Sequence, residues 1–509
     1  MKCASTEALA LWARVFEARP APALEHRLHA LNNSARLLEQ LRRYPEAEAL
    51  MAQSLALKAA QPAVIQHYVH IRQKQCAWPH DKAVGEVTPN QFLLGTSLLA
   101  MMGLSDDPAL QLLAAQRFVH EKVPKPPAVP LHLRTPPREG KVRIAYLSGD
   151  LHMHAVGLLT AELIELHDRS RFEVSAFCWT PESAMPQRQR IVRGFDRLVR
   201  IGGVDDSTAA QQIALSGIDV LVDLQGLTAG ARPGILVQRP APVQVSYLGL
   251  PGTSAVPGLD WMLVDEFTMP RELEPFCTER PLRLPGCYQV SDRQREVAPI
   301  PDRREGRARY GLPAEAFVFC SFNNNHKFTE EMFSAWMRIL AAVPGSVLWL
   351  LADNDTARAN MLASAAAHGV AAERLVFAPR VAPSEYLARF TLADLMLDTF
   401  PYNAGTTASD ALWMGLPIVT RAGRTVISRM AGSLLTAVGL PDLICDNLAE
   451  YERLAVTLGR NPARVASHRR YLAEHGRGSP LFDVPRIVRE IEDAFERLAL
   501  DARRARAGG

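Results

Sequence analysis

The stretch Leu395–Thr420, LMLDTFPYNAGTTASDALWMGLPIVT, is the most informative part of this sequence. Its apolar start predicts a buried strand, its small residues predict a turn, and Thr406 and Thr407 predict the start of a short helix. The first N–H groups of a helix lack an intrahelical acceptor and carry partial positive charge, so this helix start suits a phosphate. Asp410, about one turn further along, could accept two hydroxyl groups of the same ligand. Strand–turn–helix units are also ordinary scaffold, and the pattern alone leaves both roles open.

The same segment resembles the donor-binding segment of the protein O-linked N-acetylglucosamine transferases, the family that includes the SPINDLY-type fucosyltransferases. The family motif N-[AG]-H-T-T-x-x-D-x-L-W-x-G-x-P is kept here at Asn403, Thr406, Thr407, Asp410, Leu412, Trp413, Gly415 and Pro417. The chain departs from the motif at Gly405, where the family usually has histidine. The resemblance implies that the turn and helix start from Gly405 onward, together with Asp410, bind a nucleotide-sugar donor.

Composition narrows the class of protein. The chain has 509 residues, enough for about two to four domains. Its hydrophobic content of 48% and charged content of 22% are typical of a soluble globular protein, and a net charge of +3 is too small to argue for nucleic acid. The seven cysteines form no CxxC pair, and no signal peptide or membrane span stands out. We therefore expect a cytoplasmic protein with no nucleic-acid or membrane partner.

The first part of the chain is predicted to be helical. Residues 1–80 carry apolar residues at helical spacing, and 31–62 resemble one tetratricopeptide unit, although an ordinary helical hairpin would give the same pattern. Residues 81–140 are expected to form a helical junction followed by a linker. Six prolines between Lys122 and Pro137 indicate that this linker is extended.

From Val142 onward, apolar strands alternate with helices. Such strands are typical of parallel sheets covered by helices on both faces. One series occupies residues 141–300 and a second occupies 301–480, which predicts an α/β fold with two Rossmann-like domains that face a cleft. The resemblance implies that this is the GT-B layout. It also implies that a last helix, within 481–509, packs back on the first domain.

Candidate chemical groups follow the strands of the first domain. The resemblance places His154 at a family histidine that acts as acid/base or positions the acceptor, which suits a side chain that titrates near neutrality. The proline that usually follows this histidine is replaced by Ala155. Residues expected near the acceptor or the sugar are Asp150, Gln225, Pro251, Gly252 and Thr253. The last three form a tight turn that could approach a ligand or simply redirect the chain.

Two loops of the second domain supply further candidates. Asn324 and Lys327 follow its first strand and match the family pattern F-N-x-x-x-K. The resemblance implies that Lys327 neutralises the leaving diphosphate as a catalytic residue and that Asn324 reaches the phosphates or the sugar amide. A later loop with Arg380, Ala382 and Tyr386 resembles the one that holds the nucleobase. A capped helix start would also account for this loop, and the two roles are compatible.

No DxD pair stands out where it could bring a divalent ion to a diphosphate, so we expect no metal and no cofactor. The resemblance implies an inverting, metal-independent enzyme that transfers N-acetylglucosamine from UDP-GlcNAc to Ser or Thr of acceptor proteins. The open alternatives are GDP-fucose, UDP-glucose or a CMP-sugar as donor, asparagine as acceptor, and a noncatalytic scaffold with a degenerate transferase fold. Because the helical region is short, we expect either a narrow set of acceptor proteins or homo-oligomerisation.

The departure at Gly405 has two interpretations. Glycine could let the N–H groups before Thr406 approach the phosphate more closely and so keep the affinity for the same donor. Alternatively, it could open room for a different sugar or nucleotide. We favour the first interpretation, because Thr406, Thr407 and Asp410 still frame a site for phosphate and ribose.

Overall fold

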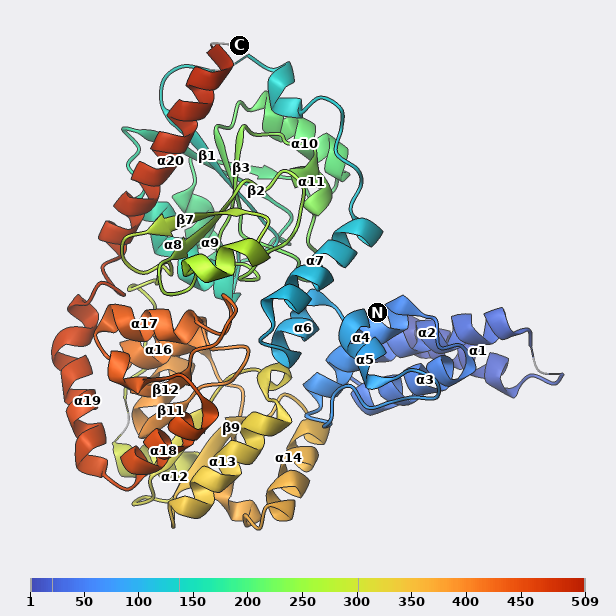
Figure 1. Ribbon diagram of the computed structural model, residues 1–509, viewed down its shortest axis with the longest axis vertical. Coiled ribbons are helices and arrows are strands. Elements are labelled where there is room, and N and C mark those ends of the chain that lie inside the picture. The colour runs from blue at the N-terminus through green and yellow to red at the C-terminus, as the bar shows by residue number, and fades with distance from the viewer. Residues whose placement is uncertain (1, 21, 137, 301, 508–509) are drawn as a thin grey trace. The chain divides into compact units, whose positions relative to one another are not determined.

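The computed structural model describes residues 2–20, 22–136, 138–300 and 302–507. It contains two sheets flanked by helices, preceded in the chain by a run of helices (Figure 1). The chain divides into two compact units. One unit comprises Met1–Ser105, Ser321–Pro379 and Thr399–Tyr402, and the other comprises Asp106–Cys320, Arg380–Asp398 and Asn403–Gly509.

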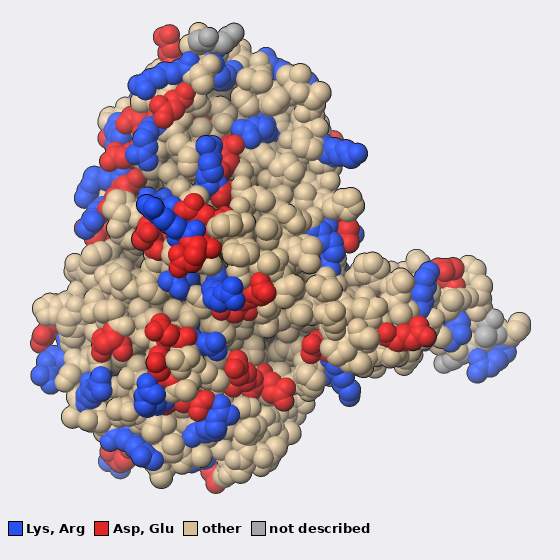
Figure 2. All heavy atoms as spheres, viewed as in Figure 1, with Lys and Arg blue, Asp and Glu red and all other residues tan. Residues whose placement is uncertain are grey.

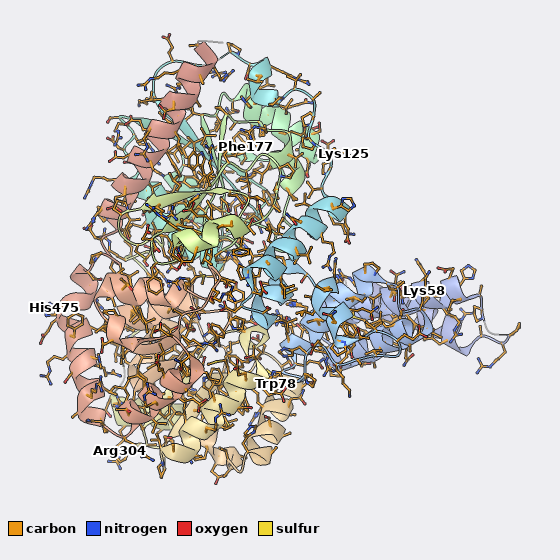
Figure 3. The ribbon with its side chains drawn as sticks, in the orientation of Figure 1. Lys58, Trp78, Lys125, Phe177, Arg304 and His475 are labelled. Carbon is orange, nitrogen blue, oxygen red and sulfur yellow. The ribbon has the colours of Figure 1, made fainter. Side chains whose placement is uncertain are left out.

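The first sheet is parallel throughout. Across the sheet its strands are β3 (Arg197–Arg200), β2 (Phe172–Cys178), β1 (Val142–Ser148), β4 (Val220–Asp223), β5 (Val243–Ser246), β6 (Trp261–Asp265) and β7 (Arg280–Leu284). The central strands are almost fully buried, as their apolar sequences predict, and Phe177 lies among them (Figure 3). The α-helices of this part are α8 (Ala155–Leu166), α9 (Pro186–Gly194), α10 (Asp206–Leu215) and α11 (Pro233–Val237).

The second sheet repeats this plan. Its strands, in order, are β10 (Leu375–Ala378), β9 (Val347–Leu351), β8 (Val318–Ser321), β11 (Leu395–Leu397), β12 (Ile418–Arg421) and β13 (Ile444–Cys445). The α-helices of this part are α12 (Arg303–Arg309), α13 (Glu330–Ala342), α14 (Asp355–Ala367), α15 (Pro383–Ala388), α16 (Thr406–Trp413), α17 (Met430–Val438), α18 (Leu448–Gly459) and α19 (Pro462–His475). Two Rossmann-like domains, predicted from the alternation of strands and helices, are therefore present.

The strand order identifies where ligands should bind. In each sheet the order reverses beside the first strand, so β1 lies between β2 and β4, and β8 lies between β9 and β11. In open α/β sheets, ligands bind at the carboxyl ends of the strands where the order reverses. The loops that leave β1 and β4, and those that leave β8 and β11, are therefore the expected ligand-binding loops. Among the residues singled out from the sequence, they carry Asp150, His154, Gln225, Asn324 and Lys327.

The N-terminal region is helical, as predicted. Its α-helices are α1 (Lys2–Glu17), α2 (Leu24–Gln40), α3 (Tyr44–Leu57), α4 (Pro62–Lys74), α5 (Pro89–Gly95), α6 (Leu98–Leu104) and α7 (Pro108–Lys122). Helices α2, α3 and α4 pack on one another in sequence order around a buried apolar cluster, in which Tyr68 stacks on Phe92 with ring centroids 4.9 Å apart. After α4, Trp78 (Figure 3) donates a 3.0 Å hydrogen bond from its indole N–H to the carbonyl of Phe328.

The proline-rich stretch that follows α7 holds one 3-10 turn and no strand in its described residues, and Pro137 lies outside them. The 3-10 turns of the chain are η1 (Leu131–Arg134), η2 (Arg271–Phe276), η3 (Asn325–Lys327), η4 (Ala372–Arg374), η5 (Arg389–Leu392), η6 (Pro441–Leu443) and η7 (Gly476–Gly478). Six of the seven cysteines are described as free thiols, and the side chain of Cys3 lies outside the description.

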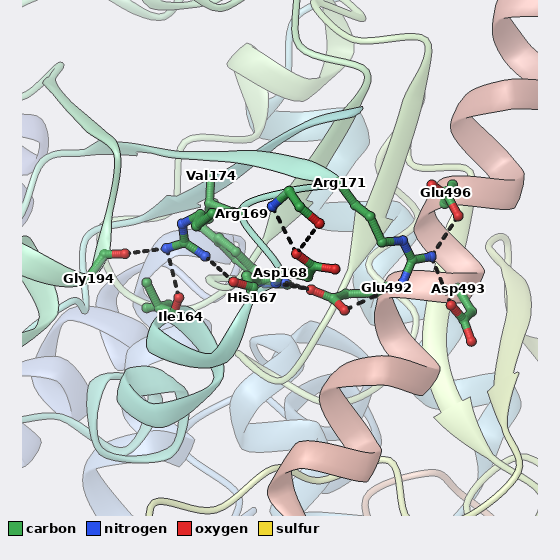
Figure 4. Close-up of polar contacts among 12 residues, drawn as sticks. Ile164, His167, Asp168, Arg169, Arg171, Val174, Gly194, Glu492, Asp493 and Glu496 are labelled. Carbon is green, nitrogen blue, oxygen red and sulfur yellow. Dashed lines mark hydrogen bonds and ion pairs between the residues drawn. The ribbon is translucent and has the colours of Figure 1, made fainter. Parts of the chain in front are cut away.

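The last helix, α20 (Val484–Ala507), packs back against α8 and along β4, β5 and β7, as the resemblance implied (Figure 1). Figure 4 shows the polar contacts that fix it. Buried Glu492 accepts hydrogen bonds from the His167 ring, at 3.0 Å, and from the N–H of Asp168, at 2.7 Å. Arg171 bridges Asp493 and Glu496 on the same helix. The outer face of α20 shows interspersed acidic and basic side chains (Figure 2).

Candidate functional site

The loops that leave β1 and β4 bring Asp150, Gln225 and His154 together. The amide nitrogen of Gln225 donates 2.8 Å hydrogen bonds to Asp150 Oδ2 and to Thr228 Oγ1. The carboxamide oxygen of Gln225 accepts from the N–H of Gly149 at 2.9 Å. Asp150 Oδ2 in turn lies 3.7 Å from His154 Nδ1. Gln225 therefore fixes the carboxylate that faces the histidine.

His154 is half exposed and is the N-cap of helix α8. Its Nδ1 lies 3.4 Å from the N–H of Val156, so the ring caps the helix. Burial lowers the pKa of His154, while the charge of Asp150 acts in the opposite direction, and the ring is therefore neutral near pH 7. While Nδ1 accepts from Val156, the neutral ring carries its proton on Nε2. If the proton moves to Nδ1, toward Asp150, the capping bond is lost and Nε2 can accept a proton from a hydroxyl group.

The turn at Pro251, Gly252 and Thr253 is fixed by hydrogen bonds to Glu279, a residue that was not singled out from the sequence. The buried carboxylate of Glu279 accepts hydrogen bonds from the Thr253 hydroxyl at 2.7 Å and from both the N–H and the hydroxyl of Ser254. The Thr253 hydroxyl is thus directed toward Glu279. The backbone of the turn, including Gly252 with a φ of 142°, remains the part that could approach a ligand.

The segment after β11 forms the helix start that the sequence predicted. Helix α16 begins at Thr406, with Gly405 as its N-cap and no side-chain cap. Its first backbone hydrogen bond runs from the N–H of Ser409 to the carbonyl of Gly405. The N–H groups of Thr406 and Thr407 therefore have no intrahelical acceptor, and such donors suit a helix start to an anion.

Asp410 is buried and forms an ion pair with Arg295, from the segment that follows β7. Burial raises the pKa of Asp410, and the guanidinium of Arg295 offsets only part of this effect. A ligand hydroxyl at Asp410 would therefore share the carboxylate with Arg295. The sequence did not predict this arginine, since nothing near position 295 distinguishes it from other surface cations.

Tyr386 belongs to the same group of residues. Its hydroxyl shares a hydrogen bond with the Thr407 side chain, and the charges of Asp410 and Arg295 act on it. Its ring packs edge-on against Phe390 and lies 4.6 Å from the guanidinium carbon of Arg389. Three predicted donor-binding residues, Tyr386, Thr407 and Asp410, are therefore neighbours. Arg380 and Ala382 precede helix α15, where Ala382 is the N-cap, and both are exposed.

The loop after β8 contains Asn324 and Lys327, the second of them in η3. The side-chain oxygen of Asn324 accepts a 3.0 Å hydrogen bond from Lys74 Nζ and lies 2.9 Å from His326 Nδ1. Lys327 Nζ lies 3.9 Å from the ring centroid of Tyr402. Lys74, at the end of helix α4, therefore brings a second cation to this loop, which the sequence did not predict.

No group of three or more His, Cys, Asp or Glu side chains could hold a metal ion within the described residues. None of the described helices is long and apolar enough to cross a membrane.

Known proteins resemble this chain over most of its length. The family model of glycosyl transferase family 41 matches residues 125–305 and 304–491. The probable UDP-N-acetylglucosamine–peptide N-acetylglucosaminyltransferase SEC of Arabidopsis thaliana is 34% identical over 364 residues, which are 70% of this chain and 37% of that protein. The corresponding SPINDLY protein of the same plant is 30% identical over 374 residues, 71% of this chain and 40% of that protein. The chain thus spans less than half the length of these relatives.

Among solved structures, a mutant of the Thermobaculum terrenum O-GlcNAc transferase matches with a TM-score of 0.78 and 26% identity, and the match covers 98% of this chain and 99% of that one. The GT-B fold class, with its preceding helical region, is therefore confirmed. The resemblance drawn from residues 401–420 is confirmed as well. The chain belongs to glycosyl transferase family 41.

Proposed function

We propose that this chain is a glycosyltransferase that moves N-acetylglucosamine from UDP-GlcNAc to Ser or Thr of acceptor proteins. The observation that carries the proposal is the grouping of Tyr386 with Thr407, at the start of α16, and with Asp410, about one turn further along that helix. An aromatic ring, a helix start and a carboxylate are the groups that a nucleobase, a phosphate and a ribose require. The names of the similar proteins in Arabidopsis and Thermobaculum support the same donor and reaction.

In the proposed inverting reaction, the acceptor hydroxyl oxygen forms a bond to the anomeric carbon while the bond from that carbon to the phosphate oxygen breaks. UDP leaves with the bonding electrons, and His154 takes the hydroxyl proton at Nε2. The N–H groups at the start of α16 balance negative charge that develops on the diphosphate, and the family resemblance gives Lys327 a charge-balancing role of the same kind. Positive charge from the protein itself supports a metal-independent reaction.

The remaining expectations belong to this proposal. We propose a cytoplasmic enzyme with protein acceptors, no cofactor, and either a narrow acceptor set or homo-oligomerisation. GDP-fucose, UDP-glucose or a CMP-sugar, and asparagine as acceptor, are the alternatives within the same fold. A noncatalytic scaffold is a second candidate, favoured by Gly405 in place of the family histidine and by the ion pair that engages Asp410.

Two measurements test the proposal. Thermal-shift screening of UDP, GDP and CMP identifies the nucleotide, and we expect UDP to stabilise the protein most. Incubation with labelled UDP-GlcNAc and cell lysate should then label proteins.

Lys327→Ala should lower the rate of this transfer by about a hundredfold or more, because a group that stabilises developing charge is removed. Lys125→Ala, a change of the same type at an exposed linker position, should leave the rate unchanged. No transfer from any nucleotide sugar would support the scaffold instead.

A further inference from the structure

Gln289 carries a buried amide group that its surroundings do not satisfy. The residue follows β7 and is 1% exposed. Its side-chain oxygen accepts a hydrogen bond from the hydroxyl of Tyr288 at 3.4 Å. Its side-chain nitrogen, Nε2, is buried and has no hydrogen-bond partner among the described residues. Buried polar groups are normally paired, so an unpaired one at this position calls for an acceptor that a ligand would bring.

The unpaired amide lies beside the start of α16. A Cβ atom placed on Gly405 would be 3.4 Å from the side-chain oxygen of Gln289 and 2.8 Å from Cε of Met430. The carboxamide therefore lies next to the N-cap of this helix. Gln289 Nε2 and the first N–H groups of α16 are all donors, so this position is suited to a negatively charged acceptor.

The position along the donor follows from the other residues of the group. Tyr386 shares a hydrogen bond with Thr407, and Asp410 lies about one turn further into the helix, so the nucleoside would lie on that side. Gln289 lies at Gly405, at the opposite end of the first turn. It therefore faces the part of the donor that lies beyond the first phosphate.

We infer that Gln289 is a donor-binding residue whose Nε2 donates a hydrogen bond to an oxygen of the second phosphate of a nucleoside diphosphate sugar. The inference rests on the proposed function and adds to it. A polar side chain from the segment after β7 supplies, at Gly405, a contact that glycine itself cannot make. Gln289 thereby becomes a determinant of diphosphate over monophosphate binding.

The test compares UDP with UMP by isothermal titration calorimetry on the full chain, with GDP and GMP as a second pair. Gln289→Leu should weaken UDP binding by about ten- to a hundredfold, the loss expected for a hydrogen bond to a charged group, while UMP binding stays unchanged. Gln289→Glu should weaken UDP further, because a carboxylate repels the phosphate. The melting temperature of ligand-free Gln289→Leu should not fall, since the variant loses an unpaired buried amide.

Gln244→Leu is the matched control. Gln244 is also fully buried, but its Nε2 donates to the carbonyls of Leu236 at 2.9 Å and Gly258 at 2.7 Å. Gln244→Leu removes these two hydrogen bonds, so it should lower the melting temperature and leave the ratio of UDP affinity to UMP affinity unchanged. If Gln289→Leu is poorly folded, Gln289→Met, which keeps the length of the side chain, gives the same comparison.

The outcomes separate this inference from the proposed function. If wild-type protein binds UDP more tightly than UMP and the Gln289 variants keep that ratio, the inference is wrong and the proposed donor class stands. The inference would also be overturned if Gln289→Leu weakened the binding of UDP-GlcNAc but not that of UDP, because the contact would then be to the sugar. If wild-type protein binds neither UDP nor GDP, the nucleoside diphosphate donor is wrong, and the role of Gln289 falls with it.

Discussion

Replacing Arg295 with methionine should destabilise the protein far more than breaking an exposed ion pair. The side chains of Arg295 and Asp410 are 10% and 7% exposed, so solvent screens their interaction weakly. Removal of one partner from such a pair leaves a buried charge and costs about 3–5 kcal/mol. Lys58→Met is the matched control, because Lys58 and Glu25 are 45% and 77% exposed, and pairs of that kind contribute about 0–1 kcal/mol.

The stability lost in Arg295→Met should depend on pH in a defined direction. Burial already raises the pKa of Asp410 with Arg295 present, and removal of the cation raises it further. A folded-state pKa above the unfolded value gives stability at low pH that is lost as pH rises. The free energy of unfolding of Arg295→Met should therefore lie further below that of the wild type at about pH 8 than at about pH 5. Arg295→Met/Asp410→Asn, which removes both charges, should recover most of the loss at the higher pH.

Urea unfolding followed by far-UV circular dichroism measures these differences, and the two single variants with the double variant form a mutant cycle. A deficit below about 1 kcal/mol for Arg295→Met would mean that the pair is effectively solvated. An equal deficit at both pH values would mean that the charge of Asp410 is not its cause. Either result would refute the argument from burial.

Three further predictions follow from the contacts described above. Gly405→His should weaken nucleotide binding but cost only about 1 kcal/mol of stability or less, because its Cβ would lie 2.8 Å from Met430 Cε, the end of a flexible side chain that can move aside. Met430→Ala in the same chain should restore nucleotide binding measured by calorimetry, and equal binding by both variants would argue against crowding. Burial raises the pKa of Asp223 to about 6, so its protonation should add up to about 3 kcal/mol to the free energy of unfolding at acid pH, and this stability should be lost as pH rises from about 4 to about 6. Melting curves of Asp223→Asn should lack this pH dependence, and a wild-type profile in the variant would exclude Asp223 as its source. Glu492→Gln should lower the melting temperature by weakening the charged acceptor of the His167 ring, and an unchanged transition would show that this contact contributes little.

Local sequence predicts the elements of the site well. The residues after β11 were expected to turn and then begin a helix at Thr406, and α16 begins there. Strand ends were less predictable. The sequence of residues 219–226 is typical of a strand, yet β4 ends at Asp223. Its carboxylate accepts hydrogen bonds from the N–H groups of Gln225 and Gly226, which turn the backbone away from the sheet.

The partners that complete the site could not be predicted, because they are distant in the chain. Arg295 lies 115 positions from Asp410, and Lys74 lies 250 positions from Asn324. Neither cation stands directly at the end of a strand, because Lys74 ends helix α4 and Arg295 lies well beyond the end of β7. Gln289 is equally inconspicuous, since its role depends on being buried beside Gly405. Periodicity and turn residues specify local structure, whereas contacts of this kind follow from the packing of the whole fold.

The same packing bears on the two interpretations of Gly405. A histidine at this position would do more than add a side chain beside the phosphate. The Cβ position at Gly405 is close to Met430 and Gln289, so the substitution also tests local packing. The two interpretations of Gly405 are therefore best separated with Met430→Ala in the same chain.

The most direct test of the central claim is amide hydrogen exchange of residues 403–413, measured with and without UDP. The first N–H groups of α16 have no intrahelical acceptor, so they should exchange rapidly in the free protein. A diphosphate bound at the helix start would accept from them, and we expect UDP to slow exchange at Thr406 and Thr407 most strongly. UDP binding that leaves exchange in 403–413 unchanged, while protecting another segment, would contradict the donor site proposed here.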